Sequence, residues 1–327
     1  LTRELYADAV TPVEVMRILK NVSRHCYMLE SAEDNKQWGR YTFLGYDPKL
    51  ELACVKGKMT IKNGTTIEMD ISHPGKMIKK ILADYRSPKL EHLPPFTGGL
   101  VGYFAYDYIC YAETSLKLQA KDEENFKDVD LMLFDKVIAF DNYRQKIVCI
   151  VNAKTEDIDR EYNKAVLELK NMTELIRSGK PQPSKQGRLT SDFRPLFDKE
   201  AYCEMVKKAK HYIKEGDIFQ VVLSNRLEAD FAGSLLDAYR VLRTTNPSPY
   251  MFYFSSDDIE MVGASPETLV KLEDGVLHTF PLAGTRKRGK TEQEDLELEK
   301  ELLADEKERA EHNMLVDLGR NDIGKIS

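Results

Sequence analysis

Long apolar runs and an excess of basic charge are both missing from this sequence of 327 residues. Apolar stretches such as 131–134 and 147–151 fall far short of the roughly 18 residues that cross a bilayer, so the sequence predicts no membrane span. Nucleic-acid partners usually require a clustered basic face, whereas the formal net charge of this chain is −6. Composition therefore favours neither a membrane nor a nucleic acid as partner.

Cysteine is also scarce. The five cysteines are odd in number, lie far apart and form no C-x-x-C motif, which favours reduced thiols in a cytoplasmic protein over a disulfide framework or a zinc site. No signal peptide precedes the first residues, which also favours the cytoplasm. Residue 1 is Leu, and the chain stops at Ser327 directly after a motif-rich stretch, so we expect both ends to be cut. The cysteines are Cys26, Cys54, Cys110, Cys149 and Cys203.

What is present argues for a packed protein. Hydrophobic residues make up 42% of the chain and aromatic residues 9%, which suits a core and excludes a wholly disordered chain. The length predicts two domains or one large one. Three glycines within 96–106 indicate close backbone approach in a buried strand. In the first part of the chain we expect strands at 41–46, 50–55, 59–61, 96–106, 130–140 and 146–152.

From residue 155 onward the apolar pattern includes stretches with the helical period of about 3.6 residues. The strands follow one another in hairpin-like series rather than in βαβ units, so the predicted fold class is α+β. The Pro- and Ser-rich segment 179–195 predicts a linker. We divide the chain into an N-terminal region 1–154, a helix and linker 155–196, and a domain 197–327. Helices are expected at 155–178, 199–214, 234–244 and 292–316, and strands at 218–223, 251–254, 260–262, 268–272 and 276–280.

Two short segments could carry chemistry, although each alone is typical of a turn. In 263–267, Gly-Ala-Ser-Pro-Glu, small residues would leave space for a ligand, and Glu267 could donate a proton to it. In 281–285, Pro-Leu-Ala-Gly-Thr, the N–H of Gly284 and the hydroxyl of Thr285 could bind a carboxylate. The basic residues that follow, at 286, 287, 288 and 290, are typical of a solvated surface.

A third candidate lies in the last predicted helix. Glu308 and Glu311 are three residues apart and therefore share one helical face. Such a pair is usually solvated, but it also suits Mg²⁺, which takes few protein oxygens and keeps water or substrate oxygens. His312, next to this pair, is more typical of a structural histidine than of a ligand or base.

Six segments follow one another along the chain, namely Leu29-Glu30-Ser31, 216–222, 246–253, 263–267, 281–285 and 308–322. Taken together and in this order, they resemble the large, chorismate-binding subunit of anthranilate synthase. The resemblance implies an α+β fold of two antiparallel sheets packed with helices, sandwich-like and incomplete at the C-terminus. It also implies that residues 1–154 form the family's N-terminal regulatory region and that 197–327 form the first part of its catalytic domain.

The family resemblance implies a lyase that makes anthranilate and pyruvate from chorismate and ammonia, the first step of tryptophan biosynthesis. The related isochorismate synthases carry a Lys where Gln220 stands, as a base for water, and a neutral amide cannot serve as that base. The aminodeoxychorismate synthases commonly carry a nucleophilic Lys where Ala283 stands. Gln220 and Ala283 therefore favour ammonia as the nucleophile.

The resemblance also implies roles for individual residues. Glu267 would protonate the leaving hydroxyl, Glu311 with Glu308 would hold Mg²⁺, and Gly284 and Thr285 would contact the substrate carboxylate. A second site would bind tryptophan as feedback inhibitor. Its residues would be Leu29, Glu30, Ser31, Pro249, Tyr250 and Met251.

Ammonia would come from a glutamine amidotransferase subunit in a hetero-oligomer, because no Cys-His-Glu constellation of a glutaminase is found in this sequence. The family's catalytic domain continues beyond the Arg320-Asn321-Asp322 motif to a catalytic His, a second pair of Mg²⁺ carboxylates and the residues that hold the pyruvyl group. We therefore expect residues 1–327 alone to be inactive. The alternatives are an aminodeoxychorismate synthase and a non-catalytic tryptophan-binding fragment.

Overall fold

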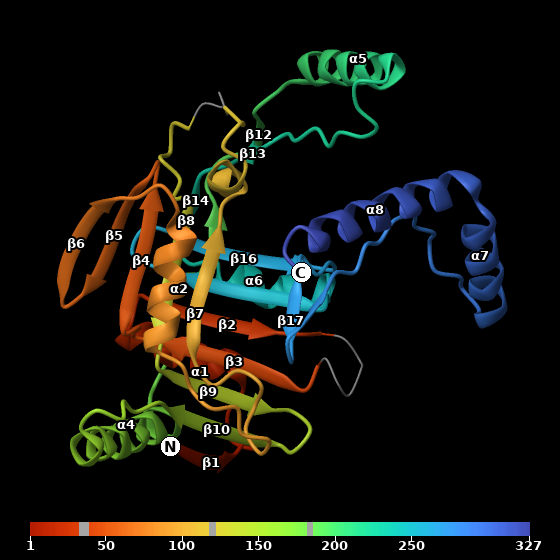
Figure 1. The fold of residues 1–327 in the computed structure, drawn as a ribbon. Helices are drawn as coiled ribbons and strands as arrows, with labels where there is room; N and C mark the ends of the chain where they lie inside the picture. The colour runs from red at the N-terminus through yellow and green to blue at the C-terminus, as the bar shows by residue number, and fades with distance from the viewer. Residues whose placement is uncertain (33–38, 118–121, 182–185) are drawn as a thin grey trace.

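The computed structural model describes residues 1–32, 39–117, 122–181 and 186–327. Two antiparallel sheets form the body of the molecule (Figure 1). The larger has seven strands in the order β1-β10-β9-β3-β2-β15-β16, and the smaller has five in the order β6-β5-β4-β8-β7. The predicted α+β class with two antiparallel sheets is confirmed.

The seven-stranded sheet combines distant parts of the chain, since β15 and β16 join strands from the first 151 residues. Helices α1, α4 and α6 cover one face of it, and side chains from these helices share one buried cluster with the sheet. Its strands are β1 (Thr2–Tyr6), β2 (Cys26–Glu30), β3 (Tyr41–Tyr46), β9 (Lys136–Asp141), β10 (Lys146–Val151), β15 (Tyr250–Ser255) and β16 (Glu260–Ser265). The helices are α1 (Pro12–Val22), α4 (Ile158–Ser178) and α6 (Leu236–Thr245).

The five-stranded sheet packs one face on α2 and the other on the large sheet. Buried side chains from both sheets meet between them, and the rings of Tyr27 and Phe134 lie 4.7 Å apart edge to face. Gly102 permits close strand pairing, because a Cβ there would lie 1.9 Å from the carbonyl oxygen of Asp130. The elements are β4 (Leu50–Val55), β5 (Lys58–Asn63), β6 (Thr65–Asp70), β7 (Gly99–Phe104), β8 (Val129–Phe134), α2 (Pro74–Asp84), the 3-10 turn Tyr106–Tyr108 and α3 (Ile109–Ala112).

The single strand predicted at 130–140 is wrong, because the chain changes sheets at Asp135. β8 ends one residue before it in the five-stranded sheet, and β9 begins one residue after it in the seven-stranded sheet. All residues of both strands are buried, and the sequence marks the crossing only by the charged pair Asp135-Lys136, without a Gly or Pro turn signal. The amide of Asn152 donates to the carbonyl oxygens of Asp135 at 3.1 Å and Thr97 at 2.7 Å, which holds the crossing in place.

The strand predicted at 218–223 is also wrong. This segment pairs with no strand of the described chain, and Phe219 and Val222 are 87% and 86% exposed. Conversely, α1 and α2 were not predicted, and they lie in the part of the chain where mostly strands and turns were expected. Their signals were local: each has Pro in its first turn, and the Thr11 hydroxyl accepts a hydrogen bond from the Glu14 N–H at 3.2 Å.

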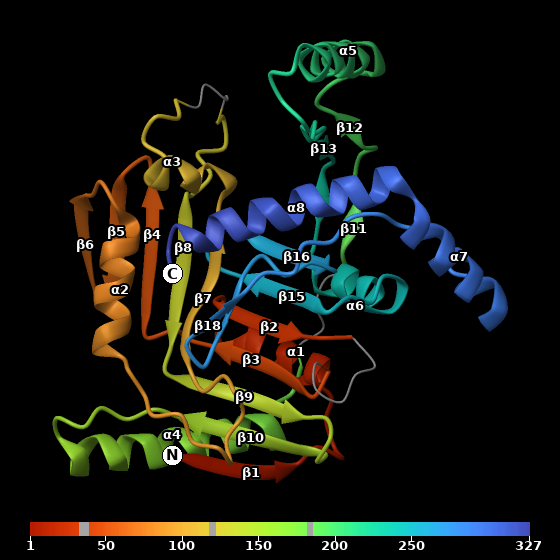
Figure 2. The same cartoon turned by 45° about the vertical axis from the view of Figure 1, so that its right-hand side comes forward.

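Three helices of the C-terminal half project from the sheets (Figures 1 and 2). They are α5 (Lys199–Glu215), α7 (Glu292–Ala304) and α8 (Glu306–Gly324), and no side chain of any of them is fully buried. The helix expected at 292–316 is divided at Asp305, whose carboxylate accepts from the N–H groups of Lys307 and Glu308 and so begins α8.

Short hairpins and ladders complete the fold. The strands expected at 268–272 and 276–280 are shorter in the structure, namely β17 (Lys271–Glu273) and β18 (Val276–His278). The other short strands are β11 (Arg188–Leu189), β12 (Arg194–Pro195), β13 (Leu227–Glu228) and β14 (Phe231–Ala232). Among the residues that the structure describes, no helix is both long enough and apolar enough to cross a membrane.

Candidate functional site

The first group of predicted site residues gathers at α8. The Gln220 side-chain amide lies 3.5 Å from Glu311 Oε1, which joins a loop to the helix. Gly284 lies against Glu308, since a Cβ built on that glycine would be 3.0 Å from Glu308 Oε2. Gly284 also has a φ of +84°, which favours glycine at this position. Segments about 90 residues apart in the chain therefore meet at one face of α8.

Arg286 belongs to this group, although its sequence context indicated only a solvated basic cluster. Its guanidinium lies 3.5 Å from Glu308 Oε1, and it donates to Asp305 at 2.8 Å and to Glu301 at 3.1 Å. The backbone N–H of Glu308 and the guanidinium together lower the pKa of Asp305. The only signal in the sequence was that Arg286 directly follows the candidate segment 281–285.

The α8 carboxylates fit a hard cation. Glu308 and Glu311 are both half-buried and face the Gln220 and Gly284 segments, so each offers oxygen atoms on the same side of the helix. Carboxylate oxygens are the ligands that Mg²⁺ prefers, and it usually takes one or two of them from the protein. The donor set present is therefore chemically suited to Mg²⁺.

Glu267 is placed differently from the α8 group. It is exposed, and its described contacts are local, since its N–H donates to Ser265 Oγ at 3.3 Å. Of the segment 263–267, residues 263–265 end β16 and only 266–267 leave it, so most of this segment is strand rather than turn. Ala283 is half-buried and Thr285 is exposed beside Gly284.

The second predicted site is assembled by strand pairing. β15 runs antiparallel to β2, with Met251 opposite Glu30, and the N–H of Ala32 donates to the carbonyl oxygen of Ser248 at 3.0 Å. Two motifs separated by about 220 residues therefore lie side by side. Their adjacency follows from the sheet order and could not be inferred from either motif alone.

The side chain of Glu30 is nearly buried, at 6% exposed, and both its oxygens are occupied. Tyr239 donates to Oε1 at 2.5 Å and Arg243 to Oε2 at 2.8 Å. Burial, and then the neighbouring Glu30 carboxylate, raise the pKa of the Tyr239 hydroxyl. Sequence reasoning missed both partners, which lie one turn apart on the predicted helix 234–244.

A cavity of about 430 Å³ opens at this point, within the size range of small-molecule sites. Of the predicted ligand-binding residues, Glu30 and Ser31 line it. Met251 is instead buried in the core beneath, and the hydroxyl of Tyr250 lies 2.5 Å from that of Thr268. The lining residues are Pro12, Glu30, Ser31, Ala32, Thr42, Asn142, Arg243 and Thr244.

Comparisons with known proteins identify the family of this chain. A family model described as chorismate binding enzyme matches residues 24–327. Anthranilate synthase component 1 of Acetivibrio thermocellus is 41% identical over 337 aligned positions, which cover 100% of this chain and 68% of that protein. The chain thus spans about two thirds of the length of the curated relatives it matches.

Solved structures show the same fold. The crystal structure of anthranilate synthase component I from Streptococcus pneumoniae TIGR4 superposes with a TM-score of 0.75 at 34% identity, covering 88% of this chain and 62% of that one. The menaquinone-specific isochorismate synthase of Escherichia coli gives a TM-score of 0.61 at 17% identity, covering 97% of this chain and 62% of that one, and so supports the fold alone.

Proposed function

This chain belongs to the chorismate-binding enzymes of the anthranilate synthase component I family, and from that premise we propose that it performs the chorismate chemistry of that synthase. In this reaction ammonia adds to the chorismate ring, the ring hydroxyl leaves, and pyruvate is then eliminated to give anthranilate. The observation that carries the proposal is the convergence of Gln220, Gly284 and two carboxylates of α8 on one another. The division into 1–154, 155–196 and 197–327 belongs to the same proposal.

Two neutral residues support ammonia as the nucleophile. Gln220 has no basic group for activating water, and Ala283 has no nucleophilic atom. Neutral ammonia needs neither a base nor a nucleophilic side chain, because it is itself a nucleophile. An amidotransferase subunit would supply it, which makes the working form a hetero-oligomer, placed in the cytoplasm.

In this proposal, each residue of the site has a separate role in the reaction. Glu267, at its exposed position after β16, would donate the proton to the departing hydroxyl. The N–H of Gly284 and the hydroxyl of Thr285 orient the substrate carboxylate. Glu308 and Glu311 would hold Mg²⁺, which supplies positive charge to that carboxylate when bound. Arg286 holds Glu308 and Asp305 in place from the other side.

Regulation is proposed at the cavity beside Glu30. Glu30 and Ser31 would receive the ammonium group of tryptophan, while Leu29, Pro249, Tyr250 and Met251 form the strand ends that support the site. Arg243 lines the same cavity and could meet the tryptophan carboxylate. Tryptophan would inhibit by favouring a state that binds chorismate poorly, and chorismate would weaken tryptophan binding by the same factor.

Tryptophan binding to residues 1–327, measured by calorimetry, tests the proposal on the part of the chain in hand. We expect saturable binding that is lost in Ser31→Leu, which adds a bulky apolar group to the wall of the cavity, and kept in Ser87→Leu, which places the same side chain on an exposed loop. Failure of a folded sample to bind tryptophan would favour an aminodeoxychorismate synthase instead.

A further inference from the structure

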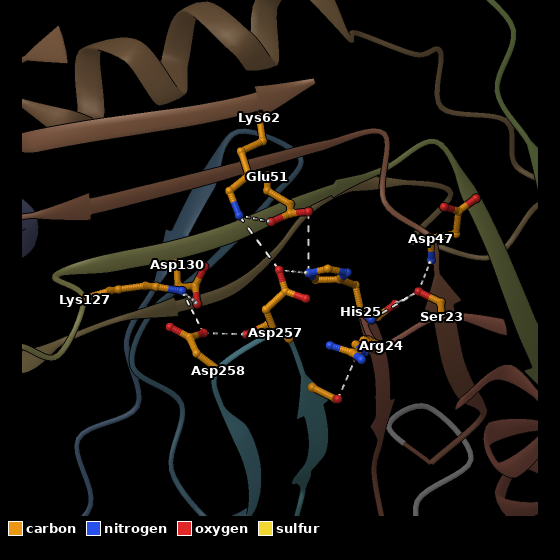
Figure 3. A network of polar contacts seen from close by, with 12 residues as sticks. Ser23, Arg24, His25, Asp47, Glu51, Lys62, Lys127, Asp130, Asp257 and Asp258 are labelled. Carbon is orange, nitrogen blue, oxygen red and sulfur yellow. Dashed lines mark hydrogen bonds and ion pairs between the residues drawn. The ribbon is translucent and has the colours of Figure 1, made fainter. Parts of the chain in front are cut away.

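Three side chains with metal-ligating atoms meet where the two sheets adjoin (Figure 3). His25 precedes β2, and Asp257 lies in the turn between β15 and β16, so both belong to the seven-stranded sheet. Glu51 belongs to β4 of the five-stranded sheet. One ligand atom from each lies within 4.8 Å of the other two. This cluster lies at the end of the β2–β15 pair opposite the Glu30 cavity, and on other elements than the α8 group.

One nitrogen of the His25 imidazole, the buried Nε2 atom, lacks a hydrogen-bond partner among the described residues. It faces Glu51 Oε1 at 3.5 Å and Asp257 Oδ2 at 3.6 Å, too far for good hydrogen bonds. A buried polar atom without a partner is costly, so a group that occupies the space between these atoms would be stabilising.

The spacing suits a small divalent cation. Zinc–nitrogen and zinc–oxygen bonds of about 2.0–2.2 Å in a tetrahedron place neighbouring ligand atoms about 3.4 Å apart. The two distances from His25 are close to that edge length. One imidazole and two carboxylates are also a ligand set that zinc accepts, whereas Mg²⁺ prefers oxygen ligands alone.

A cation already shares the two carboxylates. The ammonium group of Lys62 on β5 lies 3.5 Å from Glu51 Oε2 and 3.9 Å from Asp257 Oδ2. Its side chain is 50% exposed, so it can turn to solvent when a metal ion takes over the charge. The neighbouring Asp258 is engaged by Lys127 at 2.9 Å, which leaves Asp257 as the carboxylate of this turn that faces His25.

We propose that His25, Glu51 and Asp257 form a binding site for a divalent cation of the zinc class that joins the two sheets. The fourth position is open to water. Binding at this point would tie the β15–β16 turn and the start of β2 to β4, and would stabilise the interface between the sheets without taking part in the chorismate chemistry.

The test is a Zn²⁺ titration of chelator-treated protein, followed by calorimetry against a competing chelator and by the melting temperature. We expect one Zn²⁺ per chain and a rise in melting temperature. His25→Gln and Asp257→Asn should each weaken binding by more than about 100-fold, since loss of even an outer-shell partner costs up to about that much. Lys62→Met should tighten binding, because it removes the competing cation.

Two controls separate this site from others. His92→Gln changes an exposed histidine elsewhere, and Glu311→Gln changes the proposed Mg²⁺ site, so neither should alter Zn²⁺ binding. Absence of saturable binding to the unaltered chain would overturn the proposal. Equal affinity of folded Asp257→Asn and unaltered protein would overturn it as well, because Asp257 lies in a half-exposed turn whose change should not unfold the chain.

Discussion

Helices α4 and α5 have similar apolar patterns, but α4 is packed in the core whereas α5 is largely exposed. α4 buries five side chains against the seven-stranded sheet and α1, among them Leu169 and Met172. α5 was predicted to have a comparable apolar face, yet none of its side chains is fully buried, and Ile213 is 43% exposed. An amphipathic pattern therefore predicts that a helix forms, but burial depends on whether a complementary face lies beside it.

The strongest test of this contrast removes a methionine from each helix. Met172→Ala should lower the free energy of unfolding by about 2–4 kcal/mol, because Met172 is fully buried and its loss leaves a cavity. Met205→Ala on the half-buried side of α5 should cost less than about 1 kcal/mol. Urea unfolding of both variants checks this, and equal losses would mean that α5 is packed as tightly as α4.

A second test compares two Arg–Asp pairs. Arg40 holds Asp141 with two hydrogen bonds, of 3.1 and 2.7 Å, and the Asp141 side chain is only 4% exposed. Arg40→Met should cost about 2 kcal/mol, between the values for exposed and buried pairs. Arg288 pairs with Asp295 but is 90% exposed, so Arg288→Met should leave the urea midpoint unchanged.

A third test uses the pH dependence of stability that the Arg40–Asp141 pair should cause. Burial raises the pKa of Asp141, but Arg40 and two backbone N–H groups outweigh it, so the net pKa is lowered. A lowered folded pKa stabilises the protein above the unfolded pKa of about 3.9, and this contribution is lost as pH falls through the folded value. The stability difference between the unaltered chain and Arg40→Met should thus be full above about pH 4 and shrink below it. A constant difference in acid would contradict this assignment.

The smallest effect concerns two matched helix caps. Thr11 caps α1 and Thr291 caps α7, each accepting a backbone N–H at 3.2 Å. Thr11→Ala should lower the global stability by about 1 kcal/mol, since α1 is packed in the core. Thr291→Ala should change only local opening of α7, seen as faster amide exchange in its first turn with an unaltered melting temperature. A global loss in Thr291→Ala would show that α7 unfolds together with the body.

Much of the fold was predictable where local signals agreed. The hairpin around Gly57, the end of α5 at Gly216 and the helix ending at Ser178 all follow from turn and cap chemistry that acts within a few residues. The crossing at Asp135 was not predictable, because only the polar pair Asp135-Lys136 separates the apolar residues of β8 from those of β9, and no Gly or Pro marks a turn there. The unpaired segment 218–223 has the composition of a strand but lacks a partner in the described chain.

The candidate site also contains residues that the sequence predicted and residues that it did not. The motifs pointed to Gln220, Gly284, Glu308 and Glu311, and the structure brings these residues into contact. Tyr239 and Arg243 were missed because nothing in their immediate sequence distinguishes them from solvated residues. Arg286 was missed because it lies in a basic cluster typical of a solvated surface, although it directly follows the segment 281–285. The roles of all three arise from carboxylates that are distant in the sequence or on the next helix, such as Glu30, which lies 213 residues from Arg243.

The sequence by itself determined the family, the α+β class, most helix and strand positions and the residue types of the candidate site, because motif order, periodicity and turn chemistry are local properties. Only the tertiary structure decided which strand neighbours which, that β15 lies beside β2, that Glu30 is held by α6, and that His25 faces two carboxylates across the sheets. These contacts depend on long-range strand pairing and burial, whose energies are set by partners far away in the chain.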